Sequence, residues 1–394
     1  MSPYPPVRIG IDARNLALAE GTGVATYARV LAEACRGIGM QPELLFDRDP
    51  AIPARASRGP GRDAIRLLRA CLPGRVIAHS GSGPQSRLLC PDIFRIAQVH
   101  FNLFGRPLLA RCQNPPKLMH WTYPLPLYMP GVPNLVTIHD LIPLLQPGLT
   151  GIPGGRMRRL LLSVISRAER IVTVSETVRR QIMETLGVPG HRVVNLYQAV
   201  DLPKSLLRAA DTAPLHCPPG SFVCFGTVEP RKNIARLIEA HALSGVDTKL
   251  VILGPEGTSA KGQDFCAGSG NVLRIPWVKR AELVRAIREA RAVLFPSLAE
   301  GFGLAIAEAM ALGSPVMTSR GGATEEIAGG AALLVDPLDI RGMAAAIAAL
   351  DGQPGLRENL RAAGLRRAGV FSLEAYTARL RQFYGSLGLT GAES

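Results

Sequence analysis

The sequence predicts an α/β protein with two doubly wound domains that face each other across a cleft. Three observations predict this architecture. The chain has 394 residues, which is too long for one ordinary hydrophobic core. Short apolar segments typical of buried parallel strands alternate with helical patterns along the whole length. The alternation is interrupted once, over residues 201–220, and then begins again.

The first half contains four strand-like segments and three helical ones. Parallel strands buried on both faces are near-continuous apolar runs, whereas surface helices repeat apolar residues every three or four positions. We predict strands at residues 7–12, 117–121, 135–139 and 171–175, and helices at 23–35, 158–170 and 176–186. Residues 48–62 and 80–90 are rich in Pro, Gly, Ser and Arg, so we predict loops there.

The second half repeats the alternation more regularly. We predict strands at residues 222–227, 249–254, 271–278, 292–297, 315–319 and 332–336, and helices at 233–243, 281–290 and 303–312. Two final helices, at 356–368 and 372–386, lie beyond the second sheet, and we expect them to cross back over both domains. The resulting division is a domain over 1–203, a linker over 204–220, a domain over 221–370, and a crossover helix and tail over 371–394.

The composition narrows the class of protein. Apolar residues make up 47% and charged residues 19%, as in soluble globular proteins. The N-terminus leads almost directly into a strand-like segment and shows no secretion leader, so we expect a cytoplasmic protein. The seven cysteines are scattered and form no Cys-x-x-Cys pair, which argues against a disulfide framework or a zinc site.

The net charge of +14 is concentrated in the first half. Residues 1–200 hold 24 Lys and Arg against 12 Asp and Glu, whereas the rest hold 21 against 19. Such a balance suggests an anionic partner, namely a membrane lipid, a phosphorylated substrate or nucleic acid. We disfavour nucleic acid, because aromatic residues make up only 5% and no nucleic-acid motif is present.

One basic segment is a candidate for membrane contact. Residues 55–75 carry six Arg and one Asp, and an apolar stripe could be formed by Ile65, Leu67, Leu68 and Cys71. A segment of this kind can lie on an anionic membrane surface. A solvated loop and helix would explain the same composition equally well.

Two cations follow the first strand of the second half. Arg231 and Lys232 precede Asn233, which can cap the next helix. The start of a helix already carries partial positive charge, so two cations there are better explained if an anion lies between them. A diphosphate would suit both side chains. The alternative is a pair of solvated cations.

The segment 298–308 carries the other candidates. Gly301 and Gly303 allow close approach of a ligand to the backbone, although tight strand–helix turns also use such glycines. Glu308 stands in an apolar helix, where an unpaired carboxylate costs several kcal/mol, roughly. A ribose diol is a suitable partner, as in dinucleotide-binding folds. The alternative is that Glu308 reaches solvent through a gap in the packing.

These residues form a recognisable pattern. Glu300 and Glu308 are separated by seven residues, with Gly-Phe-Gly after the first and Ala-Met-Ala-Leu-Gly-Ser-Pro-Val after the second. The pattern resembles the retaining glycosyltransferases of family 4, which have the GT-B fold of two Rossmann-like domains. The resemblance covers nearly the whole chain, is most specific in residues 221–340, and extends over 134–144, 226–241, 292–319 and 326–337.

The resemblance implies a donor site for a nucleotide sugar. Glu308 would hold the ribose and Glu300 the hydroxyls of the donor sugar, while Arg231 and Lys232 would bind the diphosphate. Main-chain amides of Phe302, Gly303 and Leu304 would lie near the phosphate and sugar. His139 would contact the sugar from across the cleft, and the turn Gly21-Thr22-Gly23 would place Gly23 near the phosphate. The expected catalytic residues are His139, Glu300, Arg231 and Lys232.

The implied reaction is hexose transfer with retention of the anomeric configuration. Arg231, Lys232 and the helix amides would supply counter-charge to the departing diphosphate, so we expect neither a metal nor a resident cofactor. Residues 122–127 and 137–144 look most like mannosyltransferases of bacterial polysaccharide pathways, which suggests GDP-mannose and a glycan or lipid-linked acceptor, with the enzyme on the inner face of the cytoplasmic membrane. A nucleotide-sugar epimerase or phosphorylase of the same fold, and a non-catalytic sugar-binding protein, remain alternatives.

Overall fold

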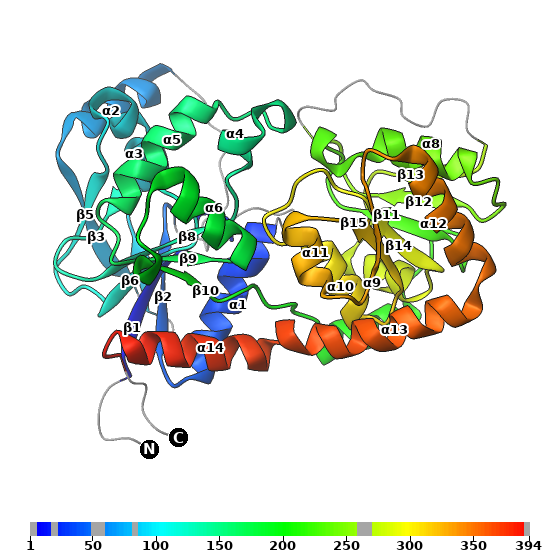
Figure 1. The fold of residues 1–394 in the computed structure, drawn as a ribbon. Coiled ribbons are helices and arrows are strands. Elements are labelled where there is room, and N and C mark those ends of the chain that lie inside the picture. Colours follow the sequence, from blue (N-terminus) through cyan, green and yellow to red (C-terminus); the bar gives the residue numbers. More distant parts are fainter. Residues whose placement is uncertain (1–5, 17–22, 49–59, 81–85, 258–269, 390–394) are drawn as a thin grey trace.

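Two β-sheets organise the chain into two domains (Figure 1). The computed structural model describes residues 6–16, 23–48, 60–80, 86–257 and 270–389. The N-terminal domain has a ten-stranded sheet of order β10-β9-β8-β6-β1-β2-β4-β3-β5-β7, and the C-terminal domain has a six-stranded sheet of order β13-β12-β11-β14-β15-β16. All neighbouring strands pair in parallel except β3 and β4.

The N-terminal domain alternates strands and helices. Its strands are β1 (Arg8–Asp12), β2 (Gln41–Phe46), β3 (Gly74–Ser80), β4 (Arg87–Leu89), β5 (Leu108–Cys112), β6 (Leu118–Trp121), β7 (Leu127–Tyr128), β8 (Asn134–Ile138), β9 (Arg170–Thr173) and β10 (Val193–Asn195). Its helices are α1 (Gly23–Gly37), α2 (Pro60–Cys71), α3 (Ile93–Phe104), α4 (Ile142–Leu145), α5 (Gly154–Ile165) and α6 (Glu176–Leu186).

The C-terminal domain follows the same scheme. Its strands are β11 (Phe222–Phe225), β12 (Leu250–Leu253), β13 (Val272–Ile275), β14 (Ala292–Phe295), β15 (Val316–Ser319) and β16 (Leu333–Val335). The helices that follow β10 are α7 (Lys204–Thr212), α8 (Ile234–Leu243), α9 (Arg280–Arg288), α10 (Leu304–Ala311), α11 (Gly322–Ala328), α12 (Ile340–Gly352), α13 (Pro354–Ala368) and α14 (Leu373–Ser386). Every residue of β11 and β12 is buried, because helices cover both faces of the sheet.

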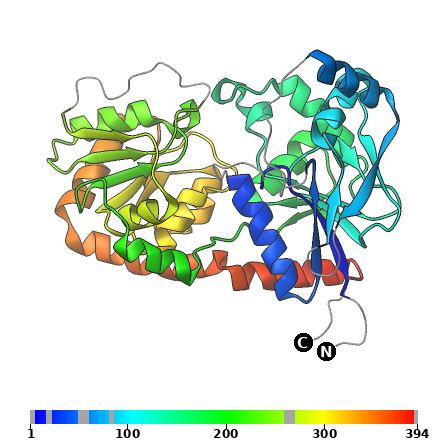
Figure 2. The same ribbon diagram turned by 180° about the vertical axis from the view of Figure 1, so that it is seen from behind.

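The last two helices cross from one domain to the other. Figures 1 and 2 show α13 along the C-terminal domain and α14 beneath the N-terminal sheet, where α14 packs on α1. The hydroxyl of Tyr384 on α14 lies 2.8 Å from Nδ1 of His120 on β6, and both residues are fully buried. The predicted crossing back of the C-terminal helices is therefore confirmed.

The segment predicted as a linker is partly helical. Residues 204–212 form α7, which packs on α9 and so belongs with the C-terminal domain. Pro203 takes the position before the helix, where its missing amide hydrogen costs nothing. The interrupted alternation suggested a linker, but a single proline at a helix start is compatible with the helix that follows.

Two further predictions in the first half are corrected. The helix predicted at 158–170 is α5, which ends at Ile165 because Arg170 already begins β9. In the loop predicted at 80–90, β4 pairs with β2 and β3, and its Leu88 is fully buried. Residues 81–85, and most of the loop predicted at 48–62, lie outside the described residues.

Candidate active site

A carboxylate lies between the two predicted cations. Glu300 follows β14, and its Oε2 accepts a hydrogen bond from Arg231 at 2.8 Å while its Oε1 accepts one from Lys232 at 2.6 Å. Arg231 also donates to Glu229 at 2.8 Å. The ammonium of Lys232 lies 4.3 Å from the ring centre of Phe295 on β14. The structure thus brings three predicted site residues together at the carboxyl ends of β11 and β14.

Burial and charge set the ionisation of this cluster. Burial lowers the pKa of Lys232, and the neighbouring Glu300 opposes that shift. Burial alone would raise the pKa of Glu300, but Lys232 and Arg231 outweigh it and hold that pKa below its usual value. Glu300 is therefore ionised at neutral pH.

The cations lie just before α8 in a short 3₁₀ turn, Pro230–Lys232. Asn233 takes the predicted cap position of α8. Its backbone is left-handed (φ 60°), and its side chain makes no capping bond. The side-chain amide nitrogen of Asn233 donates instead to the carbonyls of Pro296 at 3.1 Å and Pro337 at 2.6 Å. Asn233 therefore ties the loops after β14 and β16 to the cationic turn.

Glu308 is buried and has a partner that the sequence did not reveal. The residue is 4% exposed, and Arg280 at the start of α9 donates to its two oxygens at 2.5 and 3.1 Å. The carboxylate therefore does not point into bulk solvent, and its charge is paired as buried carboxylates require. No regular spacing connects positions 280 and 308, so only the packing of α9 beside α10 could have identified this arginine.

Residues 302–304, which lead from β14 into α10, present backbone rather than side chains. Phe302 is 5% exposed and its ring packs edge-on against Phe371, with centroids 5.3 Å apart. Gly303 has φ 95°, which favours glycine, and precedes Leu304, the first residue of α10. A helix start leaves amide hydrogens without helical partners. Any role of residues 302–304 toward an anion must therefore come from the main chain.

His139 lies at the end of β8 and is neutral. Its Nε2 donates to the carbonyl of Thr122 at 2.8 Å, and its ring stands edge-on to Tyr27 at 5.0 Å. Burial lowers its pKa to about 4. Because Nε2 carries the proton of the neutral ring, Nδ1 is left as a hydrogen-bond acceptor.

The two domains meet beside these residues. A Cβ atom on Gly301 would lie 1.9 Å from the carbonyl oxygen of His139, so only glycine fits this contact. The hydroxyl of Ser175 donates to the carbonyl of Gly301 at 2.7 Å. The first residue of α1, Gly23, accepts from Gln198 at 3.4 Å, whereas Gly21 and Thr22 lie outside the described residues.

A polar cavity of about 200 Å³ lies between the domains next to Glu300. The N-terminal domain contributes α4 and α6 to its wall, and the C-terminal domain contributes residues 298–300 and 320–324. The lining includes the side chains of Arg320, Gln146 and Gln181. Its walls therefore offer hydrogen-bond donors and acceptors to a small polar group beside the cation–carboxylate cluster.

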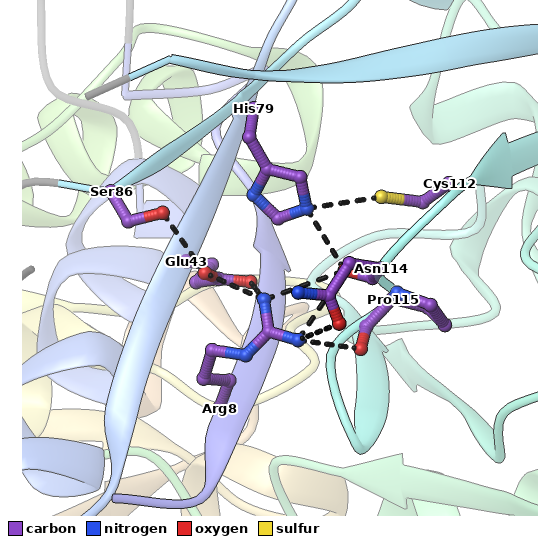
Figure 3. Close-up of polar contacts among 7 residues, drawn as sticks. All are labelled: Arg8, Glu43, His79, Ser86, Cys112, Asn114 and Pro115. Carbon is purple, nitrogen blue, oxygen red and sulfur yellow. Dashed lines mark hydrogen bonds and ion pairs between the residues drawn. The ribbon is translucent and has the colours of Figure 1, made fainter. Parts of the chain in front are cut away.

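A cysteine–histidine contact elsewhere is not a nucleophile pair (Figure 3). His79 Nε2 lies 2.9 Å from the carbonyl of Asn114, which can only accept, and 3.3 Å from the sulfur of Cys112. The nitrogen therefore donates, and it cannot take a proton from the thiol. Burial raises the pKa of Cys112. The neighbouring ion pair of Arg8 on β1 and Glu43 on β2, at 3.2 Å, makes this cluster a structural connection between strands of the sheet.

Within the part of the chain that the structure describes, no three His, Cys, Asp or Glu side chains gather as a metal site would require. The sequence has one Asp-x-Asp spacing, at Asp47 and Asp49; Asp47 follows β2, and Asp49 lies outside the described residues. Among the described helices, none is long and apolar enough to span a bilayer.

Comparison with solved structures defines the class of the fold. The chain aligns with the sucrose-phosphate synthase of Thermosynechococcus elongatus at a TM-score of 0.70 and 18% identity, covering 97% of this chain and 99% of that one. At this identity the likeness concerns the fold alone. The architecture is GT-B, with two Rossmann-like domains and a crossing C-terminal helix.

Family models and curated relatives then give the family. Residues 21–204 match the model described as Glycosyltransferase Family 4, and residues 219–351 match the one described as Glycosyl transferases group 1. D-inositol 3-phosphate glycosyltransferase 1 of Catenulispora acidiphila is 30% identical over 366 residues, which are 86% of this chain and 81% of that protein. The chain belongs to glycosyltransferase family 4.

The predicted likeness to bacterial polysaccharide mannosyltransferases is also confirmed. The O-antigen chain mannosyltransferase B of Escherichia coli is 30% identical over 249 residues, or 58% of this chain. The match spans 63% of that relative's length.

Proposed function

We propose that the protein transfers a hexose, with retention, from a nucleoside diphosphate sugar to a hydroxyl of a glycan or lipid-linked glycan. The observation that carries the proposal is the contact of Arg231 and Lys232 with Glu300 at the carboxyl edge of the C-terminal sheet. This edge is where doubly wound sheets bind nucleotides. The cluster combines cations for a diphosphate with an ionised carboxylate for sugar hydroxyls.

The cations would act on the leaving group. When the bond between the sugar and the diphosphate breaks, negative charge develops on the phosphate oxygens. Arg231 and Lys232 are held in place before that moment by Glu300 and Glu229, so little reorganisation is needed. The backbone amides at the start of α10 add donors at the same edge of the sheet. We infer that this counter-charge makes catalysis independent of a metal ion.

Glu300 would orient the sugar while remaining ionised. A carboxylate offers about four acceptor sites, and the two cations occupy one on each oxygen. The remaining sites suit the hydroxyls of a hexose, and the adjacent cavity of about 200 Å³ has room for part of one. From the facing domain, Nδ1 of neutral His139 would accept a hydrogen bond from the same sugar.

The configuration would be retained through front-side attack. We infer that neither Glu300 nor Glu308 acts as the nucleophile, because Glu300 is paired with two cations and Glu308 with Arg280. The acceptor hydroxyl would approach on the face of the departing diphosphate and pass its proton to a phosphate oxygen. In this scheme the transition state resembles an oxocarbenium ion beside the anionic leaving group.

GDP-mannose is the first donor to test. The support is the likeness to an O-antigen chain mannosyltransferase. A second relative, named for D-inositol 3-phosphate, covers more of the chain and makes other donors and phosphorylated acceptors the next choice. We propose that the enzyme works at the cytoplasmic membrane surface, because α2 exposes Ile65, Leu67 and Leu68 within the arginine-rich segment 55–75.

The proposal is tested by donor-dependent release of nucleoside diphosphate. Purified protein is incubated with GDP-mannose, UDP-glucose and other sugar nucleotides, with and without EDTA, and thermal shifts with GDP and UDP are recorded in parallel. We expect one nucleotide to stabilise the protein and its sugar to be released or transferred without added metal. Epimerisation without release, phosphorolysis, or binding of free sugar alone would each support a different function.

A further inference from the structure

The side chain of Glu326 crosses from one domain to the other. Glu326 lies on α11 of the C-terminal domain, and its Oε1 accepts from the backbone amide of Glu176 at 2.7 Å. Its Oε2 accepts from the amide of Thr177 at 2.7 Å and from the Thr177 hydroxyl at 2.6 Å. Both oxygens are therefore bonded to the first turn of α6 in the N-terminal domain.

The chemistry of this contact is specific. A helix start carries partial positive charge and unpaired amides, so an ionised carboxylate is its preferred partner. Within the described part of the chain, Glu326 forms no ion pair with an arginine or lysine side chain. The hydrogen bonds of its carboxylate therefore go to the facing domain.

The same turn reaches the candidate active site. Ser175, which caps α6, is fully buried and donates its hydroxyl to the carbonyl of Gly301 at 2.7 Å. Gly301 in turn lies against the carbonyl of His139. On the other side, Arg367 of α13 donates to the carbonyls of Glu326 at 2.7 Å and Ile327 at 3.0 Å, which fixes α11 to the helix that leads into the crossover.

We propose that Glu326 is a positioning residue for sugar transfer. By holding α6 against α11, it keeps the turn of Ser175 on Gly301 and so sets the distance between Glu300 and His139. This inference rests on the proposed function for its kinetic part only. The contact between the domains can be tested whether or not the reaction has been assigned.

The test compares Glu326→Ala with Glu325→Ala in the full-length protein. Glu325 is the matched control, because its carboxylate bonds the amide of Gly321 at 2.5 Å within the C-terminal domain and does not cross the interface. Amide hydrogen exchange at Glu176 and Thr177, X-ray scattering in solution, GDP affinity and steady-state kinetics are measured for both. Thr177→Val, alone and combined with Glu326→Ala, tests the contribution of the Thr177 hydroxyl, which donates to Glu326.

For Glu326→Ala we expect faster amide exchange at residues 176 and 177 and a larger radius of gyration, with a GDP affinity within about twofold of the wild type. We expect kcat to be at least about tenfold lower, because small misplacements of reacting groups are costly. Glu326→Asp should recover part of kcat, and Glu325→Ala should change none of these quantities. Unchanged exchange, or faster exchange with unchanged scattering and kcat, would refute the positioning role. If no donor reacts with the wild type, the proposed function fails, while exchange and scattering still decide whether Glu326 holds the domains.

Discussion

Arg280 of α9 and Glu308 of α10 form a two-point ion pair, with nitrogen–oxygen distances of 2.5 and 3.1 Å. The side chain of Arg280 is 41% exposed and that of Glu308 is 6% exposed. The carboxylate is thus buried behind a partly exposed arginine. We propose that the ribose diol of a bound nucleotide takes one or both of these acceptor positions, so that it would share or replace the bonds of the guanidinium.

Glu308 should determine recognition of the ribose. We expect the wild type to bind GDP at least about tenfold more tightly than 2′,3′-dideoxy-GDP, because the carboxylate accepts from both hydroxyls. Glu308→Gln should bind the two nucleotides about equally. Titration calorimetry gives both affinities, and Glu289→Gln, which changes a carboxylate paired with Arg285 at the surface of the same domain, is the control. A variant that still prefers the ribose form would exclude this role.

Lys232 should be needed for turnover. Removing its ammonium from the cluster with Glu300 takes away counter-charge for the leaving diphosphate, so Lys232→Ala should lower kcat at least about 100-fold. Circular dichroism should show an intact fold. Lys249→Ala, at an exposed position just before β12, is the matched control and should retain full activity. Near-normal turnover of Lys232→Ala would contradict the proposed chemistry.

Gly301 should tolerate no side chain. Its position leaves 1.9 Å between an added Cβ and the carbonyl oxygen of His139, well below contact distance, so Gly301→Ala must push the domains apart locally. We expect kcat to fall at least about 100-fold, in line with misplaced reacting groups, while GDP still binds to the C-terminal domain. Gly369→Ala is the control, because an added Cβ there meets nothing within 4 Å. Full activity of Gly301→Ala would show that the interface is looser than described.

His120 should make stability depend on pH. Burial lowers its pKa from 6.5 to about 3, so the unfolded chain binds a proton below pH 6.5 that the folded chain does not bind. The free energy of unfolding should therefore decrease by about 2 kcal/mol for this group between pH 6.5 and pH 5. His139 acts in the same direction, whereas Asp12, whose pKa burial raises to about 6, acts in the opposite one.

The contribution of His120 is isolated by comparison with His120→Asn. Denaturant unfolding at several pH values should show a less stable variant at pH 8, because bonds to Tyr384 and Thr137 are lost, but a shallower loss of stability down to pH 5. Parallel curves for the two proteins would mean that His120 is not held neutral by the fold.

The exposed apolar side chains of α2 should bind anionic membranes. Leu68 is 71% exposed beside a run of arginines, so the wild type should sediment with phosphatidylglycerol vesicles at low salt and less at high salt. Leu68→Ser should weaken this binding severalfold, because one apolar contact with the bilayer is lost. Leu365→Ser, which changes a 48% exposed leucine on α13, is the control. Equal binding to neutral and anionic vesicles would argue against an electrostatic contribution.

The two-domain architecture was predictable because buried parallel strands are short apolar runs that can be recognised locally in the sequence. Runs such as those of β11, β12 and β14 are apolar throughout, and the periodic helices between them fix the number of layers. Six strands of the N-terminal domain, β2, β3, β4, β5, β7 and β10, were not predicted; β4, for example, has three residues among prolines and serines, which carry too little pattern. Helix α7 was not predicted either, because the interrupted alternation over residues 201–220 suggested a linker.

The candidate site was predictable where its residues follow adjacent strands of the sheet, and unpredictable where segments far apart in the chain pack together. Arg231, Lys232 and Glu300 follow adjacent strands, so their proximity follows from the order of the sheet. Arg280 and Glu326 depend on how helices pack across loops and across the domain boundary. No spacing along the chain predicts that packing. In the sequence, Arg280 and Glu326 look like ordinary charged surface residues.

The course of the chain through α14 also limits how this protein can be recombined. Tyr376, Leu380 and Tyr384 of α14 complete the core beneath β1 and α1, so the first structural unit is built from both ends of the polypeptide. A hybrid enzyme made by joining the first half to the second half of a relative would pair a foreign final helix with this core. Functional hybrids should therefore exchange residues 204–371 as an internal cassette and keep residues 373–386 with the N-terminal half.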